Sequence, residues 1–248
     1  MIEKPFFPYR IYSLKIQLTT DIQHPDIMKT LLKSVSVLAA LCAFATASTS
    51  LLAQNISLPA PQKTGGMPLM EALAKRSSAR AFNTSRELTP RQMSNLLWAA
   101  FGINRDGGKR TAPSASNKQE NDLYVLLKTG AYLYDAKANT LVLVVAGDQR
   151  ELGGTQAFAK TAPFTVLMIA DGERMNANVK TREAITAGNR EMAASGAGFI
   201  GQNIYLYCAS EGLVTVVRAS VDRAKIAAAL SLKPTQWVVL AQSVGYAP

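Results

Sequence analysis

A segment with the order of a secretory signal peptide lies inside this chain, and it decides which residues have to fold together. Met28 begins "MKTLLKSVSVLAALCAFATASTSLLAQ", in which Lys29 and Lys33 precede an apolar stretch at 35–45 and small residues follow. The apolar stretch is too short to span a bilayer. Charged, apolar and small residues in this order are typical of a signal peptide, with cleavage after Ala47 or Ala53, and a buried core helix is the less consistent alternative.

The signal segment divides the chain into four parts. Residues 1–27 are predicted to be an upstream extension or mis-start, 28–53 the signal peptide, 54–66 a Pro/Gly-rich linker, and 67–248 one folded domain. We therefore expect an exported protein of the periplasm or cell envelope, with no stable membrane span after cleavage.

Cleavage would remove residues on which much side-chain chemistry depends. The only histidine is His24, and Cys208 is the only cysteine after residue 53. A chain without histidine and with one cysteine cannot build a histidine-based triad, a His/Cys zinc site or an intramolecular disulfide. We expect no metal site and no catalytic side chain; if the protein is an enzyme, a cofactor carries the chemistry.

The charge balance is basic but scattered. Five of the 27 basic and three of the 17 acidic residues precede Gln54, so residues 54–248 carry a net charge of +8. No run of five Lys or Arg occurs and no aromatic residues interleave with them. This distribution indicates a solvated basic surface rather than a nucleic-acid partner.

Hydrophobic periodicity predicts an α+β domain. Helical spacing occurs twice early in the domain, and Thr89 and Pro90 suit the N-cap and first turn of the second helix, whose apolar face carries Met93, Leu96, Leu97 and Ala100. An irregular segment is predicted at 103–121, followed by a hairpin or meander at 122–144 with Thr129-Gly130 at a turn. A short helix at 152–162 and a strand at 163–170 come next, and then a long helix from about Arg182 to Glu211 with Gly212 as C-cap. The last predicted elements are a strand at 213–217, a helix at 222–232 and a final strand at 236–246.

Two short motifs match known functional signatures only in part. Gly196, Gly198 and Gly201 fit the dinucleotide fingerprint G-x-G-x-x-G, and Asp222 lies near the offset of a ribose-binding acid, but helical residues precede them where a strand is required. "KTG" at 128–130 lacks the accompanying S-x-x-K of penicillin-binding proteins, so it is predicted to be a hairpin turn.

Four sequence stretches, taken together, identify a protein family more specifically than either of these short motifs. "RSSARAF", "LTPRQMSNLLWAAFGINR", "RTAPSASNKQENDLYVL" and "GQNIYLYCASEGLVTV" resemble the FMN-dependent nitroreductase family, and most of all its branch of thiazole/oxazole-forming dehydrogenases. The resemblance covers roughly residues 68–247. It implies a mostly antiparallel central sheet packed by helices, and a homodimer with the long central helix at its interface and two FMN sites there.

The resemblance also assigns site residues. Arg76, Ser78 and Arg80 would hold the FMN phosphate and ribityl chain, with Ser77 near the pyrimidine side of the flavin. The remaining assignments are a loop from the partner subunit that lines the ring (Pro113, Ser114, Ala115, Asn117), a segment whose backbone contacts the flavin near N5 (Val217, Arg218, Ala219, Ser220), and Gln156 as a further polar contact.

Three departures from the family pattern bear on these assignments. The usual Glu-Gly near N5 reads Ala219-Ser220, and the usual N-x-Q-P-W reads "NKQEN" at 117–121. The basic pair that many members carry after the last strand is not found after "VGYAP", so we expect Arg76 and Arg80 to contribute more of the phosphate binding.

The function implied is an exported FMN oxidoreductase that passes two electrons through flavin N5 to a small organic acceptor, such as a nitroaromatic or a quinone. NADH or NADPH is the common donor in the family. An exported enzyme would not ordinarily meet these nucleotides, so another donor is the alternative. Two alternatives stay open: a flavin- or ligand-binding protein of the same fold with little turnover, and an exported structural protein that binds no flavin.

The signal peptide gives the first prediction. Protein isolated from the cell envelope should lack residues 1–53, and its intact mass measures this. Protein that retains residues 29–53 and fractionates with the cytoplasm would contradict both the cleavage and the location.

Overall fold

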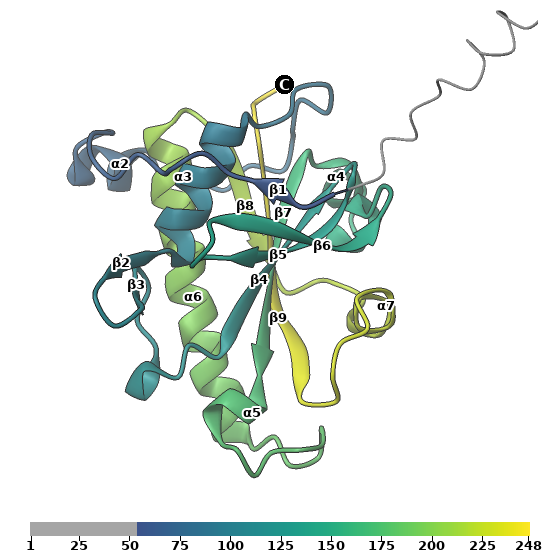
Figure 1. Cartoon of the computed structure of the whole chain (residues 1–248). Coiled ribbons are helices and arrows are strands. Elements are labelled where there is room, and N and C mark those ends of the chain that lie inside the picture. Colours follow the sequence, from purple (N-terminus) through teal and green to yellow (C-terminus); the bar gives the residue numbers. More distant parts are fainter. Residues whose placement is uncertain (1–53) are drawn as a thin grey trace, which may run out of the picture. The chain divides into compact units, whose positions relative to one another are not determined.

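A seven-stranded antiparallel sheet organises the domain (Figure 1). The computed structural model describes residues 54–248, so the predicted extension at 1–27 and signal peptide at 28–53 lie outside the described residues. The strand order is β1-β6-β5-β4-β7-β9-β8, and every paired neighbour is antiparallel. The strands are β1 (Ile56–Ser57), β4 (Asn121–Leu127), β5 (Gly130–Asp135), β6 (Thr140–Ala146), β7 (Phe164–Asp171), β8 (Val214–Arg218) and β9 (Gln236–Gly245). The predicted α+β class with a mostly antiparallel sheet is confirmed.

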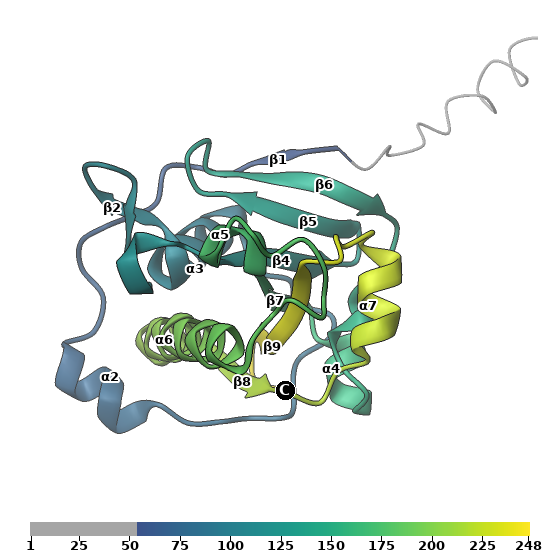
Figure 2. The same ribbon diagram turned by 90° about the horizontal axis from the view of Figure 1, so that it is seen from below.

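Helices cover both faces of the twisted sheet. Helices α3 and α6 pack on one face, and α4 and α7 lie on the other (Figure 2). Helix α2 packs on α6 rather than on the sheet. The helices are α2 (Leu69–Lys75), α3 (Pro90–Phe101), α4 (Ala157–Thr161), α5 (Gly172–Met175), α6 (Ala187–Ser210) and α7 (Arg223–Ala229), with short 3-10 turns η1 (Ala115–Asn117) and η2 (Arg150–Gly153).

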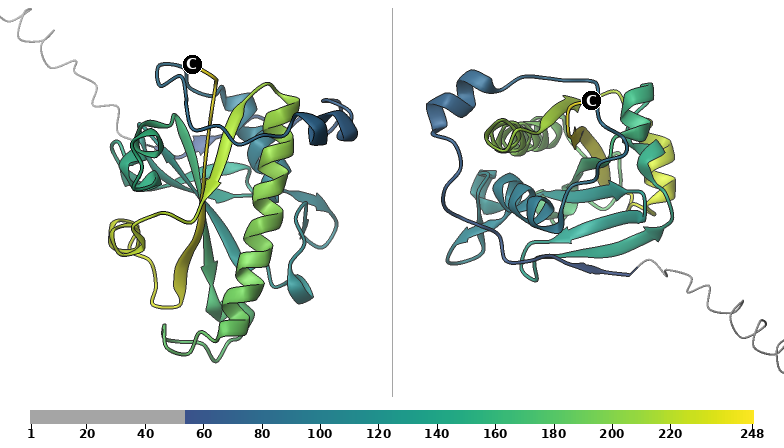
Figure 3. Two further views of the ribbon diagram at one scale, coloured as in Figure 1. Left: turned by 180° about the vertical axis from the view of Figure 1, so that it is seen from behind. Right: turned by 90° about the horizontal axis from the view of Figure 1, so that it is seen from above.

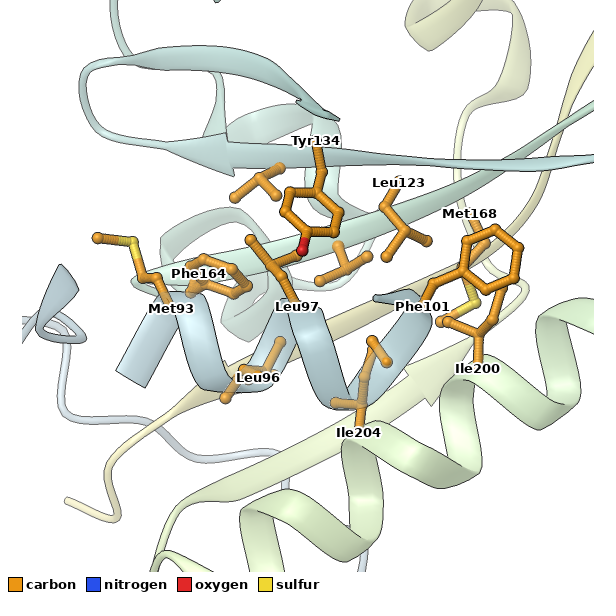
Figure 4. Close-up of a cluster of buried hydrophobic side chains, with 14 of the residues drawn as sticks. Met93, Leu96, Leu97, Phe101, Leu123, Tyr134, Phe164, Met168, Ile200 and Ile204 are labelled. Carbon is orange, nitrogen blue, oxygen red and sulfur yellow. The ribbon is translucent and has the colours of Figure 1, made fainter. Parts of the chain in front are cut away.

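Burial on both faces explains why the strand sequences are continuously apolar. In β7, Phe164, Val166 and Met168 join the core under α3 and α6, whereas Leu167 and Ile169 join the core under α7. A strand covered on both sides reads as an apolar run rather than as an alternation. Figure 4 shows the first of these cores, in which Phe101 of α3 lies beside Ile200 of α6 and Leu97 of α3 points toward Tyr134 of the sheet.

Helix α3 begins where the sequence predicts. The Thr89 side chain accepts a hydrogen bond from Gln92 N at 3.2 Å, and the Gln92 side chain accepts one from Thr89 N at 3.0 Å. This reciprocal pair is a capping box, and Pro90 occupies the first helical position. The predicted apolar face is buried as expected, with Leu96, Leu97 and Ala100 fully covered.

Helix α6 is shorter than the predicted helix. It begins at Ala187 rather than near Arg182, because Thr186 forms a capping box with Asn189 and fixes the start there. Its end is as predicted, since Gly212 has a φ of +67° and Leu213 N donates to Cys208 O. Of its glycines, Gly196 and Gly201 pack internally, whereas Gly198 has open space around it.

Two loop predictions need correction. Part of the predicted linker, Ile56–Ser57, is a short edge strand that pairs with β6. The segment predicted to be irregular contains a small hairpin of β2 (Ile103–Arg105) and β3 (Lys109–Arg110), with Gly107 and Gly108 at positive φ in its turn. Both pairings depend on partners or on turn geometry that hydrophobic periodicity does not reveal.

The capping box of α3 gives a stability prediction. Thr89→Ala should lower the free energy of unfolding by about 1 kcal/mol, because the Gln92 amide loses the side-chain acceptor that caps the helix. Chemical denaturation measures this, with Thr84→Ala as the matched control on an exposed turn, expected to change stability by less than about 0.5 kcal/mol. Equal effects of the two variants would mean that the capping box does not stabilise the helix.

Candidate functional site

The segment after α2 runs along the free edge of the sheet. Strand β8 is the last strand of the sheet, and Ala79 N donates a hydrogen bond of 3.0 Å to Thr215 O at its outer edge. Figure 3 shows this side of the molecule, with β8 beside α6. The contact places Arg76, Ser78 and Arg80 next to the strand that carries the predicted N5 segment.

Tyr205 joins the two predicted flavin segments. Its hydroxyl lies 2.7 Å from Ser78 Oγ and accepts a hydrogen bond of 3.0 Å from Val217 N. The Arg76 guanidinium lies over the Tyr205 ring, 5.3 Å from its centroid, a distance at which a cation and an aromatic face attract. One buried side chain of α6 therefore fixes the position of a guanidinium, a hydroxyl and the end of β8.

Tyr205 was missed by the sequence analysis. A signal for it was present, because Tyr205 lies four residues after Gly201 and three before Cys208, both on the buried face of α6. A tyrosine on a buried helix face needs a partner for its hydroxyl. That requirement could have identified it as a link between segments.

The Arg218 side chain has a structural role of its own, and the predicted contact of the Arg218 backbone with the flavin stays a prediction. The prediction gave its backbone a flavin contact, but its side chain turns to the face of the sheet opposite α6 and is 7% exposed. It donates to Ser243 Oγ at 3.1 Å and to Gly153 O, and it lies over the Phe158 ring. Gly154 leaves room beside it, because a Cβ there would lie 3.0 Å from Ala159 Cβ and 3.2 Å from Arg218 Nε.

Arg218 adds positive charge beneath the site. Burial, and to a lesser extent the nearby charge of Arg80, lower the pKa of its guanidinium to about 10. The group is still protonated at neutral pH, because its pKa stays well above 7. Its Nε has no hydrogen-bond partner among the described residues. None of the ion pairs within residues 54–248 involves Arg80 or Arg218. The two cationic side chains therefore lie near each other without a carboxylate paired to either.

The residue before Gln156 contacts the segment that follows β8, while the predicted flavin contact of Gln156 stays a prediction. The preceding residue, Thr155, is 3.0 Å from Ser220 Oγ through its hydroxyl, and its N–H donates to Ser220 O at 3.4 Å. Ser77, Gln156, Ala219 and Ser220 are all exposed here. The structure thus brings the segments 76–80 and 217–220 together with Gln156 at one edge of the sheet.

The predicted ring-facing loop lies elsewhere in the chain. Pro113, Ser114 and Ala115 line a cavity against Gly196 and Phe199 of α6, and Asn117 is exposed. Gly196 precedes Tyr205 by nine residues, about 13 Å along a helix axis. Within residues 54–248, no hydrogen bond joins the loop 113–117 to the segments 76–80 or 217–220.

Gln119 holds this loop in an unusual backbone conformation. Ser116, Asn117 and Gln119 have φ values of +49°, +54° and +48°, which side-chain-bearing residues rarely adopt. Gln119 N donates to Ser114 Oγ at 2.9 Å, and its side chain accepts from Arg110 Nε at 2.8 Å. These bonds stabilise a conformation that would otherwise be unfavourable.

The donor set at the β8 edge fits a phosphate-bearing ligand. Arg76 and Arg80 offer guanidiniums, Ser77 and Ser78 offer hydroxyls, and Arg218 contributes a third positive charge nearby. Guanidinium groups bind phosphate oxygens through paired hydrogen bonds. By contrast, the described part of the chain contains no group of three or more His, Cys, Asp or Glu residues placed to hold a metal ion. None of its helices combines the length and apolar character needed to cross a membrane.

Comparisons with known proteins agree with this fold. The model of the nitroreductase family matches residues 73–246. A candidate nitroreductase of Methanocaldococcus jannaschii is 31% identical over 158 residues, which are 60% of this chain and 76% of the relative. The crystal structure of a candidate nitroreductase from Ralstonia eutropha is 39% identical, with a TM-score of 0.73 over 81% of this chain and 92% of its own.

A more distant structure bears on the predicted branch. The E. coli microcin synthetase McbBCD complex, solved with truncated pro-MccB17 bound, matches with a TM-score of 0.58 over 77% of this chain and 78% of its own, at 18% identity. Identity at this level shows a shared fold only. The assignment to the thiazole/oxazole branch therefore stays a prediction.

The Tyr205 bridge can be tested by removing one oxygen atom. Tyr205→Phe should lower the free energy of unfolding by about 1–3 kcal/mol, because Val217 N and Ser78 Oγ lose a partly buried partner. Tyr207→Phe is the matched control on the same helix, since the contact of its hydroxyl with Gln92 O is long, at 3.4 Å. Denaturation of both variants decides the matter, and a smaller loss in Tyr205→Phe than in Tyr207→Phe would contradict the bridging role.

Proposed function

Because the chain belongs to the nitroreductase family, we propose that it is an exported FMN-dependent oxidoreductase that passes two electrons to a small organic acceptor. The observation that carries this proposal is the junction at Tyr205. It unites the phosphate-type donors Arg76 and Ser78 with the backbone of β8 at one edge of the sheet. The hydride and electron chemistry would be supplied by the bound flavin.

The residues of this chain would bind and orient the cofactor. Arg76 and Arg80 would hold its phosphate, and the charge of Arg218 would favour an anion at the same place. Ser77, Ser78 and Gln156 would supply further hydrogen bonds. No side chain is assigned a proton-transfer step, so positioning and exclusion of water are the contributions of the protein.

The backbone of β8 offers an amide for the flavin edge. Thr215 O and Val217 N both point away from β9, toward Ala79 and Tyr205. Backbone groups of alternate residues in a strand point to the same side. Ala219, the first residue after β8, follows next in this series. Since Val217 N already donates to Tyr205, the Ala219 amide is the better candidate for the contact near N5.

A second copy of the chain would complete the site. The loop 113–117 is separate from the phosphate-type donors within one chain, and large apolar side chains are exposed on α2 and α6, namely Leu69, Met70, Leu73, Met192 and Phe199. Exposed apolar surface of this kind marks interaction sites. A homodimer would bury it and bring Pro113, Ser114, Ala115 and Asn117 of one copy to the flavin of the other.

The proposed location rests on the signal-like segment at 28–53. An exported enzyme would work in the periplasm or cell envelope, where NADH and NADPH are not ordinarily supplied. The electron donor is therefore either one of these nucleotides or a different reductant of the envelope.

A second candidate function is flavin or ligand binding with little turnover. The exposure of the donor set at the β8 edge favours it, because Ser77, Ser78 and Arg80 are all exposed in the single chain. The two functions differ in what happens after the flavin is reduced.

The proposal is tested on the purified protein. It should be yellow and should release FMN on denaturation. Reduction with dithionite, followed by rapid reoxidation with nitroaromatic or quinone acceptors, would support turnover. A flavin that binds but does not pass electrons to any acceptor would favour the binding function, and a colourless protein that takes up no FMN would contradict both.

The arginine assignment gives a further prediction. Arg76→Ala and Arg80→Ala should each weaken FMN binding by about 1.5–3 kcal/mol, the range for losing a hydrogen bond to a charged group. Titration of the flavin-free protein with FMN measures this, and the exposed Arg182→Ala is the control, expected to leave the affinity unchanged. Unchanged affinity in both site variants would mean that the phosphate is held elsewhere.

A further inference from the structure

A cavity beneath the loop 113–117 contains a buried carboxylate. The cavity has a volume of about 330 Å³ and is lined by Pro113, Ser114, Ala115, Glu120, Met192, Ser195, Gly196 and Phe199. Most of its wall is apolar or small. Glu120 is the only ionisable residue in this lining, so its charge dominates what the cavity can bind.

Glu120 is buried without a partner for its charge. It is 2% exposed, and its Oε2 accepts no hydrogen bond from any described residue. The neighbouring Asn121 also has an orphaned oxygen, Oδ1, while its Nδ2 donates to Ala193 O at 3.2 Å. Two hydrogen-bond acceptors thus lack a donor at the same end of β4.

The nearby guanidiniums are engaged elsewhere. Arg110 donates to Gln119 Oε1 at 2.8 Å and to Phe101 O at 2.9 Å. Arg174 pairs with Asp122 at 2.7 Å and donates to Gln119 O. None of the ion pairs within residues 54–248 involves Glu120.

Gly196 keeps the space around the carboxylate open. A Cβ at this position would lie 3.0 Å from Glu120 Oε1 and 2.8 Å from Asn121 Nδ2. Phe199, which follows one turn later on α6, is half exposed at 50%, and Met192 is 44% exposed. An unpaired buried charge is costly. The carboxylate would be stabilised best by a molecule that brings a positive group to Glu120 and places an apolar part against the apolar lining of the cavity.

We propose that this cavity binds small organic cations, with Glu120 recognising the positive group and Phe199, Met192 and Pro113 contacting a flat apolar body. The evidence for cation binding is the cavity itself and does not depend on the proposed function. Its role as the subsite for the electron acceptor rests on the proposed function, since Pro113–Ala115 belong to the loop assigned to the flavin of the second copy. The acceptor would then be a flat molecule that carries an amine or amidine.

The test uses three probes of one shape and different charge: benzamidinium, benzamide and benzoate. Each probe is titrated into the purified protein, and calorimetry or ligand-observed NMR measures its affinity. Benzamidinium should bind most tightly, benzamide less tightly and benzoate least tightly. Glu120→Gln should weaken benzamidinium by about tenfold or more, the equivalent of one hydrogen bond to a charged group, and should leave benzamide nearly unchanged. Glu183→Gln, at an exposed position, is the control.

Folding of the variants is checked by thermal unfolding, and Glu120→Asp gives a second comparison that keeps the charge. It should retain the preference for benzamidinium over benzoate. Equal binding of all three probes, or a preference that survives in Glu120→Gln, would overturn the proposal. So would absence of probe binding together with a weaker dimer in Glu120→Gln, because the carboxylate would then pair with a cation of a second copy.

Flavin content is measured on the same samples by visible absorption, which separates the two proposals. A Glu120-dependent preference for cations in protein that takes up no FMN would keep the cation site and reject the oxidoreductase. Protein that binds FMN but shows no preference for the cation would keep the oxidoreductase and reject the cation site.

Discussion

The close approach of α6 to the sheet governs both the fold and the candidate site. Gly201 faces Gln242, where a Cβ would lie 3.2 Å from Oε1, and Gly196 faces Glu120 and Asn121. Glycine is costly in a helix interior, by up to about 1 kcal/mol relative to alanine, but here it lets the helix lie near β4 and β9. Only at this short separation does the Tyr205 hydroxyl reach both Ser78 and Val217. The same helix therefore forms the core under α3, anchors the phosphate-type donors and lines the cavity around Glu120.

The electrostatics of the domain place opposite charges in two separate regions. At the β8 edge, Arg80 and the buried Arg218 lie near each other. Although burial lowers the pKa of Arg218 to about 10, the group stays charged at neutral pH, so an anion is favoured there. Beside Gly196, which precedes Tyr205 on α6 by nine residues, Glu120 is buried with an unpartnered oxygen, so a cation is favoured there. If a second copy brings these regions together, a phosphate-bearing cofactor would lie against the arginines, and a positively charged substrate would lie against Glu120. Apolar side chains exposed on α2 and α6 are consistent with such a contact.

Much of the fold could be predicted from the sequence, because it depends on local signals. The capping box at Thr89, the apolar face of α3 and the continuous run of β7 each reflect a single element and its burial. The start of α6 was misjudged because the capping box of Thr186 was not recognised. The segments that carry Arg76, Ser78 and Val217 could be identified, and the structure brings them together. What could not be predicted depends on tertiary packing: the bridge through Tyr205, the turn of the Arg218 side chain away from α6, and the burial of Glu120.

The central claim is that one flavin site uses Arg76 and Arg80 of one copy and the loop 113–117 of another. It is tested most directly by counting FMN in mixed dimers, in which one copy carries Arg76→Ala and Arg80→Ala and the other carries substitutions at Ser114 and Asn117. Each parent dimer should bind FMN poorly. The mixed dimer should regain one site of normal affinity, because it combines the intact arginines of one copy with the intact loop of the other. Mixed dimers that bind FMN no better than their parents would show that the site is built within a single chain.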